Sequence, residues 1–187
     1  MLRATSAAVS VALVLIALKL AAWLITASVG LLSSLADSAM DALASLINLF
    51  AVRHALQPAD SEHRFGHGKA EPLAGLGQAA FISASGIYLI FEAVGRLIEP
   101  RVIEQGGLGL GVMVFSIAVT SALVAYQRSV VRRTDSLAIR ADSMHYATDI
   151  LVNAGVIVSL LLVMFLDWGA ADPIVALIIA GFIIFSA

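Results

Sequence analysis

The sequence predicts an all-α membrane protein, a bundle of six transmembrane helices with both termini in the cytoplasm. The first observation is composition: 60% of the 187 residues are hydrophobic, 13% are charged, and the mean hydropathy is +0.98. Soluble domains carry about 25% charged and about 45–50% apolar residues. The second observation is that the apolar runs are continuous and rich in Ala and Leu, whereas membrane β-barrels show short alternating segments. An ordinary cytosolic fold and a barrel are therefore excluded.

The apolar runs are separated by charges or by Gly and Pro, and a helix needs about 20 residues to cross ~30 Å of hydrocarbon. We predict helices at 6–28, 31–56, 72–98, 107–127, 136–166 and 172–187. The first run follows Arg3, as a signal peptide would, but it is more than about 20 residues long, contains Lys19 and leads directly into the second run. Because six spans use most of the chain, we expect residues 1–187 to form one transmembrane domain.

The third observation is the distribution of the eleven Lys and Arg residues, because positive charges collect on the cytoplasmic side. Eight fall on one side of the expected bundle: Arg3, Arg53, Arg64, Lys69, Arg128, Arg132, Arg133 and Arg140. Arg96 and Arg101 fall on the other side, where we expect turns at Gly30 and at 167–173. Lys19 and Glu92 lie within spans, where they are expected to snorkel or to pair between helices.

Two spans carry ionisable residues at membrane depth. Burial of each such residue in the bilayer costs free energy, so their presence indicates a functional site. The second span holds Asp37 and Asp41, and the fifth holds His145 and Asp149. Each pair is spaced i, i+4, so both of its side chains share one helix face. If the two faces opposed each other, three carboxylates and one imidazole would form a plausible tetrahedral shell for a divalent cation such as Zn²⁺. Asp142 is the competing ligand, nearer the cytoplasmic surface.

An alternative is that each pair is a separate structural feature, with the acids protonated or hydrogen-bonded to polar neighbours. The candidate neighbours are Ser34, Ser38, Asn48, Thr148 and Asn153. At 1.5 Å of rise per residue, the two pairs lie at different depths unless the fifth helix tilts or extends past the membrane surface. The length of the expected span at 136–166 favours such an overhang.

The loop between the second and third spans holds a second group of possible metal ligands. Asp60, His63 and His67 could form a cation site on the cytoplasmic side, with Glu71 in reserve. Glycines on either side of His67 allow a tight backbone around it. The alternative is a histidine-rich loop that is only solvated.

The run HRFGHGKAE, from His63 to Glu71, closely resembles the loop signature of the cation diffusion facilitator family, in its bacterial zinc and ferrous-iron efflux branch. The spacings Asp37-xxx-Asp41 and His145-xxx-Asp149 are similar to the intramembrane site of that family. The resemblance covers essentially the whole chain, up to the start of the sixth span.

The resemblance implies a homodimeric antiporter of the bacterial cytoplasmic membrane that exports Zn²⁺, or Fe²⁺ or Cd²⁺, in exchange for protons. Carried over by position, the transport site would be Asp37, Asp41, His145 and Asp149, and a secondary loop site would be Asp60, His63 and His67. Members of the family usually continue into a cytoplasmic metal-binding domain. This sequence stops at Ala187, so that domain is expected to be absent.

The transport hypothesis is alternating access around the intramembrane site. Metal ligands must lose their protons to bind, so metal and protons compete for the same groups. His145 is the expected switch, because an unperturbed imidazole titrates at about 6.5. An imidazole among carboxylates suits Zn²⁺ first and tolerates Fe²⁺ or Cd²⁺.

Other classes of function are weaker matches to this sequence. A membrane zinc hydrolase needs an open coordination position and a general base, and the motif H-E-x-x-H is absent. A passive proton or cation channel remains an alternative to a carrier. Metal flux that is coupled to a pH gradient would distinguish the carrier from the channel. With no cysteine, no P-loop and no GxGxxG motif, we expect no prosthetic group, nucleotide or nucleic-acid partner.

Overall fold

The computed structural model describes residues 1–27, 29–98, 107–166 and 170–186, and the regular structure in this part is helical. Its helices are α1 (Leu2–Thr26), α2 (Val29–Ala55), α3 (Ala70–Ile98), α4 (Gly107–Thr134), α5 (Leu137–Leu166) and α6 (Ala171–Ser186). Within the described residues, five helices are long and apolar enough to cross a membrane, and α6 is a shorter apolar helix of 16 residues. The predicted all-α membrane bundle is confirmed.

The predicted end of the fourth helix at residue 127 is wrong, because α4 continues to Thr134. Residues 128–133 include three arginines, which leave the hydrocarbon but are good helix formers. Loss of hydrophobicity therefore shows where a helix leaves the membrane and not where it ends. The helix ends at Asp135, whose backbone is left-handed with φ 49° and whose N–H donates to the Val131 carbonyl at 2.8 Å.

The predicted turn at Gly30 is also wrong. Helix α1 ends at Ala27, which adopts φ 50° and donates its N–H to the Trp23 carbonyl at 2.7 Å, and Gly30 lies inside α2. A left-handed cap is typical of helix ends, but it is usually a glycine. Arg101 and residues 167–169 of the other expected outer turn lie outside the described residues.

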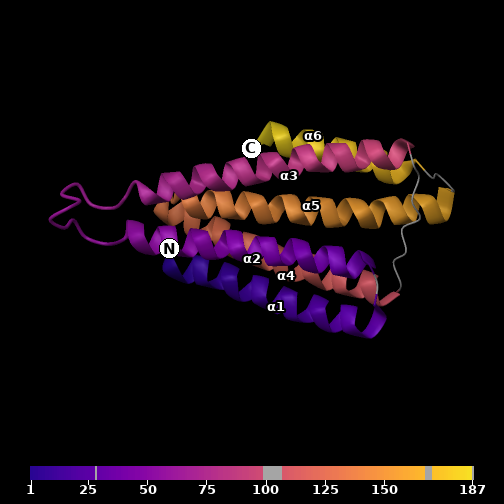
Figure 1. Ribbon diagram of the computed structural model, residues 1–187, viewed down its shortest axis with the longest axis horizontal. Coiled ribbons are helices and arrows are strands. Elements are labelled where there is room, and N and C mark those ends of the chain that lie inside the picture. Colours follow the sequence, from indigo (N-terminus) through magenta and orange to yellow (C-terminus); the bar gives the residue numbers. More distant parts are fainter. Residues whose placement is uncertain (28, 99–106, 167–169, 187) are drawn as a thin grey trace.

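Helix α5 lies in the middle of the bundle, with α3 and α6 on one side and α1, α2 and α4 on the other (Figure 1). Helix α1 presents a buried stripe with small residues at Ala4, Ala8 and Ala12, one helical turn apart. Small residues let helix backbones approach closely in a bilayer. Against this stripe, Leu123 of α4 and Tyr146 of α5 form part of the buried apolar core.

The eight basic residues predicted on one side of the membrane belong to chain segments at one end of the bundle. Figure 1 shows the N-terminus and the loop between α2 and α3 at this same end, and the shorter α6 runs toward it. Arg3 lies in the first turn of α1 and Arg53 in the last turn of α2, and the remaining six lie in that loop, in the last turns of α4 or at the start of α5. The eight charges therefore lie on one side of the bundle, as the sequence predicts. That this end faces the cytoplasm stays a prediction.

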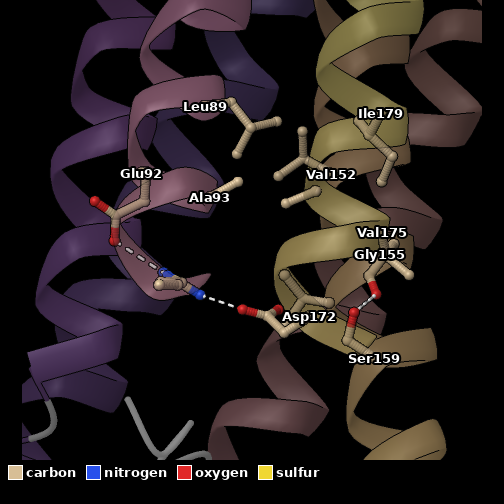
Figure 2. Close-up of a pocket in the computed structure, with 12 residues that line it drawn as sticks. Leu89, Glu92, Ala93, Val152, Gly155, Ser159, Asp172, Val175 and Ile179 are labelled. Carbon is tan, nitrogen blue, oxygen red and sulfur yellow. Dashed lines mark hydrogen bonds and ion pairs between the residues drawn. The ribbon is translucent and has the colours of Figure 1, made fainter. Parts of the chain in front are cut away.

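Helix α6 is held closely against its two neighbours. A Cβ added at Gly155 of α5 would overlap Ile179 Cδ1, and one added at Gly86 of α3 would lie 2.9 Å from Ile184 Cγ1. At the end of the bundle opposite the termini, Arg96 of α3 donates to Asp172 Oδ2 of α6 at 2.7 Å (Figure 2). These contacts make α3, α5 and α6 one packed wall of the bundle.

Arg96 also donates through Nε to Glu92 Oε1 at 3.1 Å, one turn earlier on α3 (Figure 2). Glu92 therefore pairs within its own helix, and Arg96 makes the connection between helices. Beside this ion pair is a cavity of about 110 Å³ lined mainly by apolar side chains, including Leu89 and Val152.

Candidate metal centres

Helices α2 and α5 bring the two predicted pairs of ionisable residues to one place. His145 Nε2 lies 3.1 Å from Asp41 Oδ1 and 3.8 Å from Asp149 Oδ2. One ligand atom from each of these three residues lies within 4.8 Å of the other two. The two helix faces therefore meet, and α5, with 30 residues, is long enough to extend past the depth of the site.

These side chains share a cavity of about 440 Å³ between α1, α2, α3, α5 and α6. Because one water occupies about 30 Å³, the cavity is large enough for a cation with several waters. Asp37 lines the same cavity one turn before Asp41, but it is not among the three residues whose ligand atoms converge. Leu89 and Val152 line both this cavity and the smaller one beside Arg96.

The imidazole of His145 is held on its other side by an aromatic ring. Phe81 of α3 meets it edge to face, with ring centroids 5.4 Å apart and an interplanar angle of 76°. The His145 side chain is only 4% exposed. Aromatic packing excludes water from that face, so the polar contacts of the ring point to the two aspartates.

The polar neighbours proposed as partners for the acids hydrogen-bond elsewhere. Ser34, through its carbonyl, and Ser38 accept from Lys19; Asn48 donates to the Ala138 carbonyl, Thr148 to the His145 carbonyl and Asn153 to the Asp149 carbonyl. In the part of the chain that the structure describes, Asp149 Oδ2 is buried without a hydrogen-bond partner. A buried polar atom left in this way is costly, and a bound cation would compensate it.

Asp142, the competing ligand, faces a different helix. It is fully buried, and its Oδ2 accepts from Gln127 Nε2 of α4 at 2.6 Å. It lies three residues before His145, about one turn nearer the start of α5, and its carboxylate contacts α4 and does not line the main cavity. The three-residue cluster at the main cavity does not include it.

Lys19 lines this cavity, although the sequence analysis expected it only to snorkel or to pair between helices. It lines the cavity with Asp37, Asp41, His145 and Asp149, although its helix carries no other charged residue beyond Arg3. The signal was its place within a span, where a charge marks a functional site unless it reaches the surface. Its partner on α2 could not be read from spacing along α1.

The loop between α2 and α3 forms the second cluster. His63 Nδ1 lies 3.5 Å from Asp60 Oδ1, and His67 Nε2 lies 3.4 Å from Asp60 Oδ2. A ligand atom from each of the three residues falls within 4.8 Å of the other two. Gly66 adopts φ 77°, a left-handed backbone that a glycine adopts without strain, and this turn returns the chain to His67.

The Asp60 carboxylate is fixed by the backbone of its own loop. The N–H groups of His63 and Glu62 donate to Asp60 Oδ1 at 2.6 and 3.0 Å, and this hydrogen bonding, that of His63 first, holds the pKa of Asp60 below its usual range. A lowered carboxyl pKa stabilises the folded loop above the unfolded value, and this contribution is lost as pH falls through the folded value. Asp60 is therefore ionised and available to a cation at neutral pH.

A further histidine adjoins the loop cluster. The ring of His54, at the end of α2, lies 4.4 Å from that of His67, centroid to centroid, in an edge contact. His67 is 8% exposed, and its Nδ1 is buried without a hydrogen-bond partner in the described residues. The sequence shows that His54 lies close before the loop cluster in the chain, but only the fold shows that its ring contacts that of His67.

Comparison with known proteins agrees with a transmembrane bundle. The family model described as the cation efflux transmembrane domain matches residues 6–187. The chain is 46% identical over 185 residues to the cation-efflux pump FieF of Salmonella arizonae, and 45% identical to proteins of the same name from Salmonella paratyphi A and Salmonella agona. Each of these matches covers 99% of this chain and 61% of the relative, so the chain spans about three fifths of their length. The chain belongs to the cation efflux family, whose transmembrane domain it matches over nearly its whole length.

Proposed function

We propose that the chain exports divalent metal cations from the cytoplasm in exchange for protons, with Zn²⁺ as the first substrate and Fe²⁺ or Cd²⁺ as further ones. The observation that carries this proposal is the convergence of Asp41, His145 and Asp149 from two helices inside an apolar bundle. Ionisable groups at such depth are characteristic of ion pathways. The relatives at 45–46% identity are named cation-efflux pumps, which supports the same class of function.

The donor set supports zinc. One imidazole nitrogen and carboxylate oxygens are ligands that Zn²⁺ takes in tetrahedral geometry. Asp37 is the proposed fourth ligand, because it lines the same cavity one turn from Asp41 and a change of rotamer would bring its carboxylate inward. A site closed by four protein ligands suits carriage of the ion, since hydrolysis requires an open position for water.

Exchange with protons follows from the same groups. A metal ion binds the ionised carboxylates and the neutral imidazole, so binding releases protons, and protons from the outside displace the ion. His145 contacts both Asp41 and Asp149 and is the proposed switch, because protonation of its Nε2 removes the metal's nitrogen ligand. Alternating access would expose this one site first to the cytoplasm and then to the outside, so that the proton gradient drives metal out.

The other assignments extend the proposal. Asp60, His63 and His67 are the proposed secondary site, because they too bring ligand atoms within 4.8 Å of one another. The proposed assembly is a homodimer in the cytoplasmic membrane of a bacterium, as the resemblance to the cation diffusion facilitator family implies. The relatives named above are bacterial.

The direct test is metal flux into proteoliposomes that contain the purified chain, with an imposed pH gradient. We expect Zn²⁺ uptake that rises with the gradient, stops when a protonophore collapses it, and is accompanied by proton movement in the opposite direction. Metal flux that is insensitive to the gradient would indicate a passive channel and contradict the exchange mechanism. No flux of Zn²⁺, Fe²⁺ or Cd²⁺ under any gradient would contradict transport by this chain.

The loop cluster gives a separate prediction. Asp60→Asn removes the carboxylate that faces both His63 and His67, so we expect zinc titration calorimetry to lose one class of binding site while the intramembrane site stays occupied. Glu62→Gln is the matched control, because Glu62 is an exposed acid in the same loop and outside the cluster. Equal zinc stoichiometry in wild type, Asp60→Asn and Glu62→Gln would contradict a loop site.

A further inference from the structure

Lys19 is a buried positive charge in the lining of the main cavity. It belongs to the buried face of α1, and the residue as a whole is only 7% exposed. Its Nζ donates to Ser38 Oγ at 2.6 Å and to the Ser34 carbonyl at 3.1 Å, both on α2. The ammonium is therefore held against α2 inside the bundle, whereas the head group of a snorkelling lysine lies in water.

The partners of Lys19 place it beside the proposed transport site. Ser34, Ser38 and Asp41 follow one stripe of α2 at the spacing i, i+4, i+7, so the ammonium is held on the same helix face as a metal ligand. Lys19 also lines the main cavity with Asp37, Asp41 and Asp149, which are the carboxylates that interact with its charge. His145 lines the same cavity from α5.

The net charge of the side chains in this cavity matches a divalent cation. Three carboxylates and one ammonium leave two negative charges, and a single divalent cation brings the sum to zero while His145 is neutral. A monovalent cation would leave the cavity negative, and without Lys19 a divalent one would too. Uncompensated charge inside a low-dielectric bundle is unfavourable, so the balanced state is the stable one.

We propose that Lys19 is a built-in counter-cation of the transport site, which matches the site to one divalent ion and lowers its affinity enough for the ion to be released. The inference rests on the proposed function, because it concerns the same cavity. The ammonium already offsets part of the negative charge of the empty site, so binding of the metal gains less free energy than it would without Lys19, and removal of the ammonium would trap the metal. Lys19 does not ligate the metal; it acts through its charge.

A purely structural role predicts something different. If the ammonium only tied α1 to α2, a neutral hydrogen-bond donor of similar length would replace it without effect on metal affinity. Two of its three donors have acceptors on α2, and an amide could satisfy these two. Removal of the charge and removal of the hydrogen bonds can therefore be separated by substitution.

The test compares Lys19→Gln, Lys19→Met, Lys19→Arg and Ser38→Ala for the Kd of Zn²⁺ by calorimetry in detergent and for zinc flux in proteoliposomes. We expect Lys19→Gln and Lys19→Met to bind Zn²⁺ roughly tenfold more tightly and to turn over more slowly, because a like charge near the ion is gone. Lys19→Arg keeps the charge and should bind like the wild type. Ser38→Ala loses the 2.6 Å bond but keeps the ammonium, so its Tm should fall while its Kd stays within about twofold of wild type.

The opposite result is equally defined. A Kd for Lys19→Gln that equals or exceeds that of a flux-competent wild type overturns the counter-cation and leaves the proposed function standing. Absence of zinc binding and flux in the wild type overturns the proposed function and, with it, this inference. If Lys19→Met does not fold, the result for Lys19→Gln is used alone, because its amide can still donate hydrogen bonds to α2.

Discussion

Replacement of Asp149 with asparagine is expected to abolish proton-driven zinc flux. The asparagine has nearly the same volume, so the packing of α5 is preserved, but the site loses one of its negative charges and an anionic ligand. Asp149 Oδ2 lies 3.8 Å from His145 Nε2 and has no hydrogen-bond partner within the described residues, so binding a cation would break no hydrogen bond of this oxygen. Loss of even an outer partner of a metal ligand costs about 10–100-fold in affinity, so loss of the ligand itself should cost at least about 100-fold.

The measurement is the Kd of Zn²⁺ together with the initial rate of uptake into proteoliposomes at a fixed pH gradient. Asp135→Asn is the matched control, because Asp135 is exposed between α4 and α5 and its left-handed backbone suits asparagine. We expect the control to bind and transport zinc like the wild type. Flux in Asp149→Asn that equals the flux of the control would remove Asp149 from the site.

The spans were predictable because the bilayer forces backbone groups to pair within each helix, so a continuous apolar run has few alternatives to a helix. The ends were less predictable, since they depend on local backbone geometry. Ala27 ends α1 in a left-handed conformation that nothing in its side chain favours, and the arginines of α4 extend that helix past the apolar run. Hydropathy reports the position of the lipid, and helix ends respond to other forces.

The candidate metal site, too, could be predicted only in part from the sequence. The spacing of Asp37 with Asp41 and of His145 with Asp149 shows which residues share a face of their own helix. It does not show how far each helix is rotated or shifted against its partner, and that alignment places Asp41 within 3.1 Å of His145 while Asp37 lies outside the close cluster. The contact of Lys19 with Ser38 depends on packing of α1 against α2, for which no pattern within either span is a guide.

The second large effect is expected from His145→Asp, which should change metal preference more than it changes total transport. The substitution replaces the nitrogen donor of the cavity by oxygen, and all-oxygen sites favour Mn²⁺ over Zn²⁺ relative to sites with an imidazole. We expect the ratio of Mn²⁺ flux to Zn²⁺ flux to rise by roughly tenfold, which corresponds to about 1.4 kcal/mol of altered preference. The measurement is initial uptake of Zn²⁺, Cd²⁺ and Mn²⁺ at one pH gradient, each expressed relative to zinc.

A reciprocal exchange separates donor chemistry from charge. The double variant Asp41→His with His145→Asp returns one imidazole and the original number of carboxylates to the cavity, and moves the nitrogen across the 3.1 Å contact to α2. If the kind of donor atom sets selectivity, the double variant regains the preference for Zn²⁺ that the single variant loses. If the single variant keeps the wild-type order of the three metals, His145 does not determine selectivity. A double variant with the preference of the single one would instead show that the nitrogen must come from α5, because only the position of the imidazole differs from wild type.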